Sequence, residues 1–210
     1  MKKAPLIFLS AIVLAPVAYC VPALQLYSPG ATYDFNTDTW VMNASDFELW
    51  VIAANTNVNR LYGVRLVVAL ASGDTPVDGG ISVNGASLMA SAFKFGVPPM
   101  ADDSGTMPTH GIYPTYFAEF FIGNILNAPE TVYDMQPGQT GSAPGKTFKY
   151  QVSTSYDFVH FDAFGYYDPY KFKFAPFSHD AEYAIPEPGS FLLLTLGLLG
   201  TGIIRRRRRN

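Results

Sequence analysis

The sequence "TFKYQVS" at residues 147–153 alternates apolar and polar side chains with a period of two. Phe148, Tyr150 and Val152 occupy one set of positions, and Lys149 and Gln151 lie between them. Successive side chains of a β-strand point to opposite faces of the sheet. The stretch therefore predicts a strand with one face in the core and the other in water.

Similar runs of β-branched and aromatic residues recur along the chain, separated by Gly, Pro, Asn and Asp, while helical periodicity is nearly absent. "FELWVIAA" (47–54) and "VRLVVALA" (64–71) are more continuously apolar and predict central strands covered on both faces. About eight short strands favour one all-β domain, an antiparallel β-sandwich over residues 24–185. The expected strands are Leu24–Tyr27, Thr39–Met42, Phe47–Ala53, Gly63–Ala69, Ile81–Val83, Tyr116–Ile122, Thr147–Val152 and Val159–Tyr166.

Two Pro- and Gly-rich stretches, Val97–His110 and Asn127–Lys146, are expected to be long loops. In the first, Asp102 and Asp103 precede Ser and Gly, which suits either a Ca²⁺ site or an ordinary solvated turn. "GSAPGKT" (141–147) lacks the spacing of a phosphate-binding loop, and we expect it to be a hairpin loop.

The three histidines are the strongest candidates for polar chemistry. His160 lies two residues from Asp162, and His179 is followed directly by Asp180. The fold can bring these groups together as a metal site or a base–orienter pair, whereas the simpler expectation is a hydrogen-bonded histidine in a β-protein. Including the first loop, the candidate metal ligands are Asp102, Asp103, His110, His160, Asp162 and His179.

The segment Tyr156–Phe177 contains ten Phe or Tyr residues among its 22 positions. Aromatic faces stack on sugar rings, so this density motivates a glycan-binding hypothesis, although buried aromatics also dominate the cores of such domains. The rings expected in the core are Phe158, Phe161 and Phe164. The rings expected to be exposed and to bind glycan are Tyr166, Tyr167 and Tyr170.

The N-terminus has the three-part layout of a secretory signal peptide: two lysines, an apolar stretch and small residues. Signal peptidase is expected to cleave after Cys20 or after Ala23, which makes residues 1–23 the longest form of the signal. The chain has no cysteine after position 20, so the exported domain forms no internal disulfide.

Between residues 21 and 185 there are 16 acidic and seven basic side chains, a difference of −9, compared with −3 for the whole chain. A domain this acidic is a poor partner for nucleic acid, whose phosphates require a basic face. No nucleic-acid partner is expected.

The C-terminus ends in an uncharged run of 14 residues, 191–204, followed by five arginines. A helix of that length spans about 21 Å at 1.5 Å per residue, less than the roughly 30 Å hydrocarbon core. The run predicts a short transmembrane helix with its basic end in the cytoplasm, either as a transient inner-membrane segment or as a permanent anchor.

The order Pro-Glu-Pro, apolar run and arginine cluster over residues 186–210 resembles the PEP-CTERM sorting signal. The resemblance implies processing by an exosortase of a biofilm-forming Gram-negative bacterium, cleavage at or near the Pro-Glu-Pro, and delivery to the cell surface or extracellular matrix. The residues that carry it are Pro186, Glu187, Pro188, Arg205, Arg206, Arg207, Arg208 and Arg209.

The body of the chain resembles the choice-of-anchor families of exported bacterial domains, in particular choice-of-anchor N. "VPALQLY" at residue 21, "HGIYPTYFAEF" at residue 110, "VHFDAFGY" and "KFAPFSHDAEY" carry this resemblance. It implies no catalytic activity or functional residue.

Three functions remain open. The chain is expected to be a non-enzymatic surface or matrix protein that binds exopolysaccharide, with no cofactor required unless Ca²⁺ binds the first loop. The alternatives are a secreted hydrolase using carboxylates or a His/Asp cluster, and a structural β-domain that binds another surface protein. The sequence contains no G-x-S-x-G or H-E-x-x-H motif to favour the hydrolase.

Overall fold

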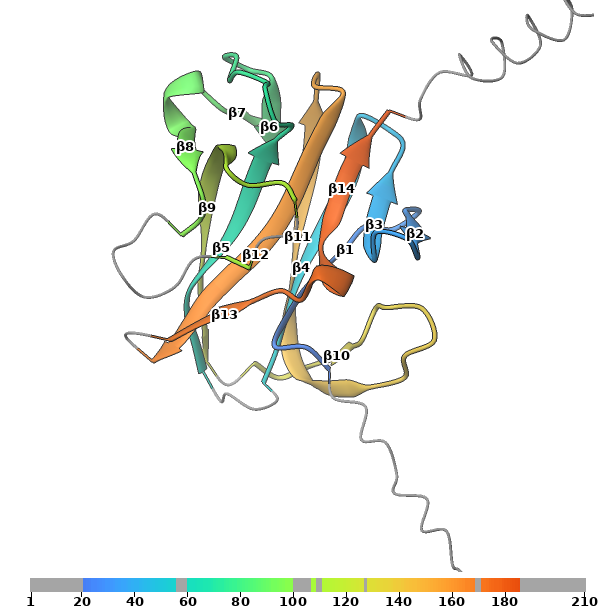
Figure 1. Ribbon diagram of the computed structural model, residues 1–210. Helices are drawn as coiled ribbons and strands as arrows, with labels where there is room; N and C mark the ends of the chain where they lie inside the picture. Colours follow the sequence, from blue (N-terminus) through green and yellow to red (C-terminus); the bar gives the residue numbers. More distant parts are fainter. Residues whose placement is uncertain are drawn as a thin grey trace, which may run out of the picture.

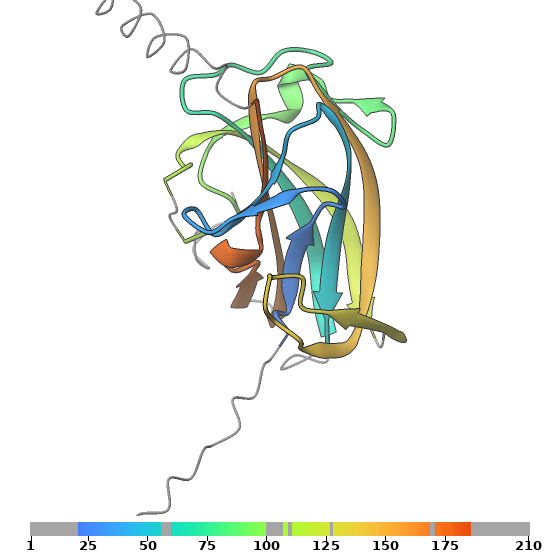
Figure 2. The same cartoon turned by 90° about the vertical axis from the view of Figure 1, so that its right-hand side faces the viewer.

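The computed structural model describes residues 21–55, 60–99, 107–108, 111–126, 128–168 and 171–185. Within these ranges the chain forms β-strands and two short 3₁₀ helices, η1 (Ala90–Ala92) and η2 (Phe177–His179). The strands form two sheets that lie face to face (Figures 1 and 2). The all-β prediction is confirmed.

The smaller sheet has the order β1-β4-β11-β6-β7, and β10 pairs with the other end of β11. The opening pattern lies in β11, where Val152 is fully buried and Phe148 and Tyr150 pack against the core. The ammonium of Lys149 lies on the other face, 4.1 Å from the ring of Trp50. The strands of this sheet are β1 (Leu24–Tyr27), β4 (Asp46–Ala54), β6 (Ile81–Val83), β7 (Ala86–Ser87), β10 (Glu130–Tyr133) and β11 (Ser142–Thr154).

The larger sheet has the order β2-β3-β14-β12-β5-β9-β8, and β13 also pairs with β12. All its ladders are antiparallel except one: β14 runs parallel to β3. The expectation of a purely antiparallel sandwich is wrong at this point, because β14 returns from the far end of the chain beside β3. The strands are β2 (Thr32–Asp34), β3 (Thr39–Met42), β5 (Arg60–Leu70), β8 (Lys94–Gly96), β9 (Thr115–Leu126), β12 (Phe158–Asp168), β13 (Lys171–Phe174) and β14 (Ala181–Ala184).

The main core lies between the sheets and contains Phe161 together with alternate residues of β5, such as Leu66 and Val68. The intervening residues Val67 and Ala69 are also fully buried, on the outer face of the larger sheet. β5 is therefore covered on both faces, as its continuous apolar sequence predicts.

The outer face of the larger sheet holds a second, smaller apolar cluster. Phe164 packs there with Phe117, Met107 and Tyr113, and the last two come from the connection between β8 and β9. Phe161 and Phe164 are thus buried as expected, on opposite faces of β12, while Phe158 is half-buried. This second cluster therefore covers part of the outer face of the larger sheet.

The predicted loop Asn127–Lys146 is wrong in its extent. It contains β10 and the start of β11, which pair as a hairpin, and the turn is confined to residues around Gly138. The same pairing places "GSAPGKT" mostly within β11 instead of in a hairpin loop. Pro144 is tolerated because it lies near the start of β11, before the pairing with β4 begins at Gly145. The polar residues of β10 are tolerated because most of this strand is exposed.

The expected signal peptide before residue 21 and the sorting segment 186–210 lie outside the described residues. None of the helices among the described residues has the length and apolarity needed to cross a membrane. β1 begins at one end of the sandwich and β14 finishes at the other (Figure 1).

Candidate functional site

Alternate residues of β12 face outward from the larger sheet, away from the main core. His160, Asp162 and Phe164 occupy successive outward positions, and Tyr166 continues the series beyond an irregularity in the β5 ladder. The first two are polar and buried, whereas Tyr166 is 37% exposed. One strand face thus carries two different candidate sites.

The imidazole of His160 is surrounded by carboxylates. Its Nε2 lies 3.2 Å from Oδ2 of Asp162 and 3.6 Å from Oδ2 of Asp180, and its Nδ1 lies 3.9 Å from Oε2 of Glu182. The side chains of His160, Asp162 and Asp180 are only 2–3% exposed, and that of Glu182 is 17% exposed. We call these four residues the His160 cluster.

Strand register explains why residues far apart in sequence meet here. In the β12–β14 ladder His160 is paired with Glu182, and Phe161 with Ala181. Extending that register by one residue places Asp180, the residue after η2, opposite Asp162. The cluster therefore depends on the return of the C-terminal segment beside β12.

Tyr113 covers the cluster from the connection that leads into β9. Its hydroxyl donates a hydrogen bond to Oδ2 of Asp162 at 2.8 Å, and its ring packs edge-on against Phe117. Burial, together with the nearby Asp162 carboxylate, raises the pKa of Tyr113 well above its usual value. Tyr113 therefore stays protonated and keeps donating to Asp162 at any physiological pH.

Opposing effects act on the pKa of His160. Complete burial lowers it, but the charge of Asp162 and hydrogen bonding to Asp162 and Glu182, with a further contribution from Asp180, outweigh the burial. The net result raises the pKa from 6.5 to about 10. In the absence of any other cation, His160 is an imidazolium held by three carboxylates.

His179 makes a separate pair, with Asp134 instead of the adjacent Asp180. Its Nε2 lies 2.9 Å from Oδ1 of Asp134, and its Nδ1 lies 2.7 Å from the hydroxyl of Ser178. Adjacent residues at the end of η2 point in different directions, so Asp180 joins His160 while His179 faces the β10–β11 turn. Asp102, Asp103 and His110, the remaining candidate metal ligands, lie outside the described residues.

At the other end of the same strand face, three aromatic rings contact one another across three strands. The ring centroids of Tyr62 and Tyr166 are 6.2 Å apart with an angle of 24° between their planes, and Phe172 meets Tyr166 edge-on at 6.3 Å. We call these three residues the aromatic row. Gly63 makes room for it, because a Cβ at that position would lie 2.3 Å from Cε1 of Tyr166.

The predicted group of three tyrosines does not form one surface in the described residues. Tyr167 is exposed, but it lies by Lys173, whose ammonium is 5.7 Å from its ring, whereas Tyr166 contacts the adjacent Phe172. Successive strand residues face opposite ways, which separates the two tyrosines. Tyr170 lies outside the described residues.

Polar groups lie one row of residues away from the aromatic row. Arg65, opposite Phe164 in the β5–β12 ladder, forms a 3.4 Å ion pair with Glu119. Its guanidinium also lies 5.8 Å from the ring of Phe121, which is exposed. Charged hydrogen-bonding groups and exposed rings therefore occur together on this part of the sheet.

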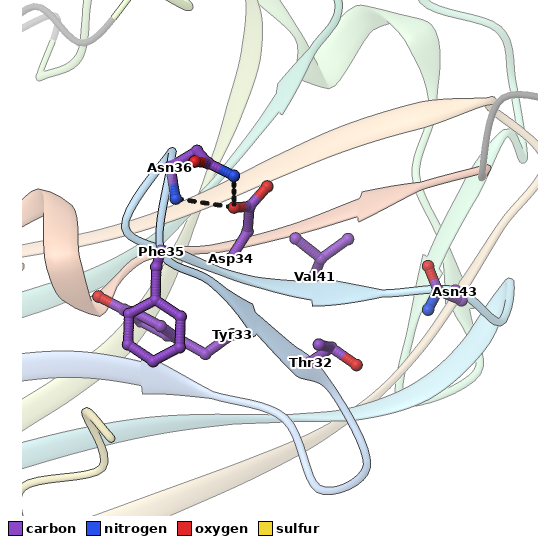
Figure 3. Close-up of a pocket in the computed structure, with 7 residues that line it drawn as sticks. All are labelled: Thr32, Tyr33, Asp34, Phe35, Asn36, Val41 and Asn43. Atoms are coloured by element: carbon purple, nitrogen blue, oxygen red, sulfur yellow. Dashed lines mark hydrogen bonds between the residues drawn. The ribbon is translucent and has the colours of Figure 1, made fainter. Parts of the chain in front are cut away.

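A surface hollow of about 430 Å³ lies beside β2 and β3, away from the aromatic row (Figure 3). Phe35 is 72% exposed at its edge, next to Asp34 and Asn36. One oxygen of Asp34 accepts hydrogen bonds from both the backbone and the side-chain amide of Asn36. This hollow is the alternative place where a ring and polar groups could meet a sugar.

Residues 184–209 match the family described as the PEP-CTERM protein-sorting motif. None of the curated proteins matches the chain. The chain thus carries the motif of exported, membrane-transiting proteins of Gram-negative bacteria that an exosortase processes.

Sequence reasoning noted Asp180 but did not place it at His160, and it missed the other residues that strand pairing supplies. Asp180 lies directly before β14 and Glu182 lies in it, and this strand is too short to show a clear alternating pattern. Tyr62 and Phe172 enter the aromatic row through β5 and β13. The position of Asp180 next to His179 marked it as a candidate for polar chemistry. Only the register of the β12–β14 ladder shows that Asp180 and Glu182 lie beside His160.

Proposed function

We propose that this exported protein is a non-enzymatic surface or matrix protein and that it binds exopolysaccharide through the aromatic row. The observation that carries the proposal is the contact of Tyr62, Tyr166 and Phe172 on an outer sheet face where Tyr166 remains partly exposed. Rings of this kind offer an apolar surface to sugar rings, and the tyrosine hydroxyls add hydrogen-bonding groups.

The position of the row relative to the sorting motif supports this proposal. The matched motif begins at residue 184, at the end of β14, where Ala184 pairs with Phe158 at the start of β12. Tyr166 lies eight residues further along β12, which is about 26 Å at roughly 3.3 Å per residue. A chain held at its C-terminal end would thus present the aromatic row away from the point of attachment.

The neighbouring charged residues give a basis for selectivity. Arg65 and Glu119 carry several hydrogen-bond donors and acceptors, and the side chain of Arg65 is 39% exposed. Sugar hydroxyls both donate and accept, so this pair can contact the equatorial edge of a sugar that stacks on Tyr166. We expect a neutral or acidic polymer with free hydroxyl groups.

The burial of the His160 cluster supports a non-enzymatic role over the hydrolase alternative. A catalytic base must lie within hydrogen-bonding reach of its substrate. His160, Asp162 and Asp180 are nearly inaccessible beneath Tyr113 and η2. A domain that binds another surface protein is the remaining alternative, and it would use the same exposed rings.

Processing at both ends belongs to the same proposal. Val21 is buried with Ile52, Ala54 and Val132, and the amide of Ala54 donates to the carbonyl of Ala23 at 3.0 Å. This packing supports signal-peptide cleavage after Cys20. We further propose that 191–204 crosses the inner membrane transiently, that the exosortase then releases the domain to the cell surface or biofilm matrix, and that the body is a choice-of-anchor domain.

A pull-down on the producer's own exopolysaccharide tests the binding proposal. We expect Tyr166→Ala to reduce retention of the exported protein at least tenfold, because it removes the central ring of the row. Phe35→Ala is the matched control, since it removes a more exposed ring from the hollow in Figure 3. Equal retention of Tyr166→Ala and wild type would exclude the aromatic row as the binding surface.

A further inference from the structure

Three donor atoms of the His160 cluster converge on one point. One nitrogen of His160 and one oxygen from each of Asp162 and Asp180 all lie within 4.8 Å of one another. The three residues are buried, and they come from two segments of the chain, β12 and the residue that follows η2. Such convergence of an imidazole and two carboxylates is the donor set of a metal site.

The separations between donors fit a small ion. Zinc binds imidazole nitrogen and carboxylate oxygen at about 2.0–2.2 Å, so donors at the corners of a tetrahedron are about 3.3–3.6 Å apart. His160 Nε2 lies 3.2 Å from Asp162 Oδ2 and 3.6 Å from Asp180 Oδ2. These edges require little movement to accept an ion at the centre.

The surrounding contacts also match those of a metal centre. A histidine that binds metal through one ring nitrogen usually has a carboxylate, carbonyl or water at the other nitrogen, which sets the orientation of the ring. The carboxylate of Glu182 lies on that side of the ring, with Oε2 3.9 Å from Nδ1, and it would have to move closer to form this hydrogen bond. The Tyr113 hydroxyl donates at 2.8 Å to Asp162 Oδ2, the same oxygen that faces His160 Nε2, and so fixes its position.

We propose that His160 Nε2, Asp162 and Asp180 bind one Zn²⁺ ion. An imidazole ligand favours Zn²⁺ over Ca²⁺ and Mg²⁺, which prefer oxygen ligands throughout. The ion takes the place of the proton on Nε2, which is released to solvent, and water supplies the fourth ligand. Three protein ligands and a water are also found at catalytic zinc sites, but these three side chains are only 2–3% exposed, so a substrate could not reach the water position. The ion would instead tie Asp180, directly before β14, to β12.

This site is independent of polysaccharide binding and differs from the Ca²⁺ loop expected from the sequence. The test uses the full chain purified in mild detergent, stripped with a chelator, reloaded with Zn²⁺ and dialysed. Metal is measured by mass spectrometry, and the midpoint of thermal unfolding is recorded before and after loading. We expect one tightly held Zn²⁺ per chain and a higher midpoint in the loaded protein.

Asp180→Asn removes a ligand and is expected to abolish retention of the ion. Asp134→Asn is the matched control, because it makes the same change in the His179 pair and should retain Zn²⁺ fully. Glu182→Gln leaves all three ligands and should weaken Zn²⁺ affinity by about 10- to 100-fold. This mild variant keeps the test decisive if Asp180→Asn does not fold.

Three results would overturn the proposal. One is a wild-type protein that retains no Zn²⁺ after dialysis and shows no change in its unfolding midpoint. Another is equal retention by wild type, Asp180→Asn and Glu182→Gln, which would place the ion elsewhere. Loss of Zn²⁺ in Asp134→Asn together with Asp180→Asn would likewise assign it to a different site.

Discussion

The two halves of the outer face of β12 carry opposite kinds of side chain. Next to β14, the ionisable residues His160 and Asp162 are almost fully buried, whereas next to β13 the aromatic residue Tyr166 is exposed. Charged groups ordinarily stay in water unless they are paired, so the buried half is the unusual one. Partial exposure of Tyr166 is ordinary in itself, and what distinguishes that half is the contact of Tyr166 with two further rings.

The covering segments account for this difference. Met107 and Tyr113 lie over the half that contains His160, while in the part of the chain that the structure describes the half that contains Tyr166 has the short strand β13 beside it. Buried charges are tolerated only when they are paired, and exposed rings persist only where they cost little stability. We therefore expect mutations in the covered half to change stability and mutations in the open half to change binding.

Asp162→Ala should have the largest effect on stability. It removes the nearest carboxylate from His160 and the acceptor of the Tyr113 hydroxyl. Breaking a buried ion pair from one side costs about 3–5 kcal/mol. Urea unfolding should show this loss in the free energy of unfolding, while the remaining folded fraction still binds exopolysaccharide. A change below about 1 kcal/mol would mean that the cluster contributes little to the fold.

The stability of the metal-free protein should also depend on pH through His160. Its pKa is raised from 6.5 in the unfolded chain to about 10 in the folded one, so its contribution is complete below pH 6.5 and disappears as the pH rises through 10. We expect chelator-treated protein to lose roughly 2–4 kcal/mol between pH 6.5 and 10. His160→Gln should flatten this part of the profile, and an unchanged slope in that variant would contradict the assignment.

Gly63→Ala should moderately reduce both the stability of the protein and its binding of polysaccharide. Gly63 has a φ of +54°, and the added methyl group would lie 2.3 Å from Tyr166. The strained backbone and the displaced ring together should cost roughly 2 kcal/mol. Polysaccharide retention should fall as well, because Tyr166 can no longer lie beside Tyr62. Gly30→Ala provides the control, since a Cβ there meets no atom within 4 Å at a similarly positive φ of +84°.

Tyr166→Ala should have the smallest effect on stability. The side chain is partly exposed, and its contacts with Tyr62 and Phe172 lie at the open end of the sheet. We expect a change of at most about 1 kcal/mol in the free energy of unfolding. A much larger loss would indicate that the aromatic row is part of the core and that any loss of binding reflects unfolding.

The contrast between the two regions was only partly predictable from sequence. The alternation in residues 147–153 and the apolar run in β5 identified strands because each pattern is local. β10 and β13 were missed because each has only four residues and each lies just after a proline. The parallel partner of β14 is set by a long-range return of the chain, which no local pattern encodes.

The candidate sites show the same limit. The pairing of His160 with Asp162 follows from their two-residue spacing on one strand face, which the sequence displays directly. After η2, Asp180 lies beside His160, whereas His179 pairs with Asp134. These contacts depend on the path of the turn and on the register of β14, which the sequence does not show. Exposure of Tyr166 was predicted, but its neighbours were not.

A crystal structure of the exported protein with an oligosaccharide cut from the producer's exopolysaccharide would test the central claim most directly. The account predicts a sugar ring against Tyr166, between Tyr62 and Phe172, with hydroxyl groups reaching Arg65 or Glu119. A sugar bound over Phe35 in the β2–β3 hollow, with the aromatic row left open, would contradict it.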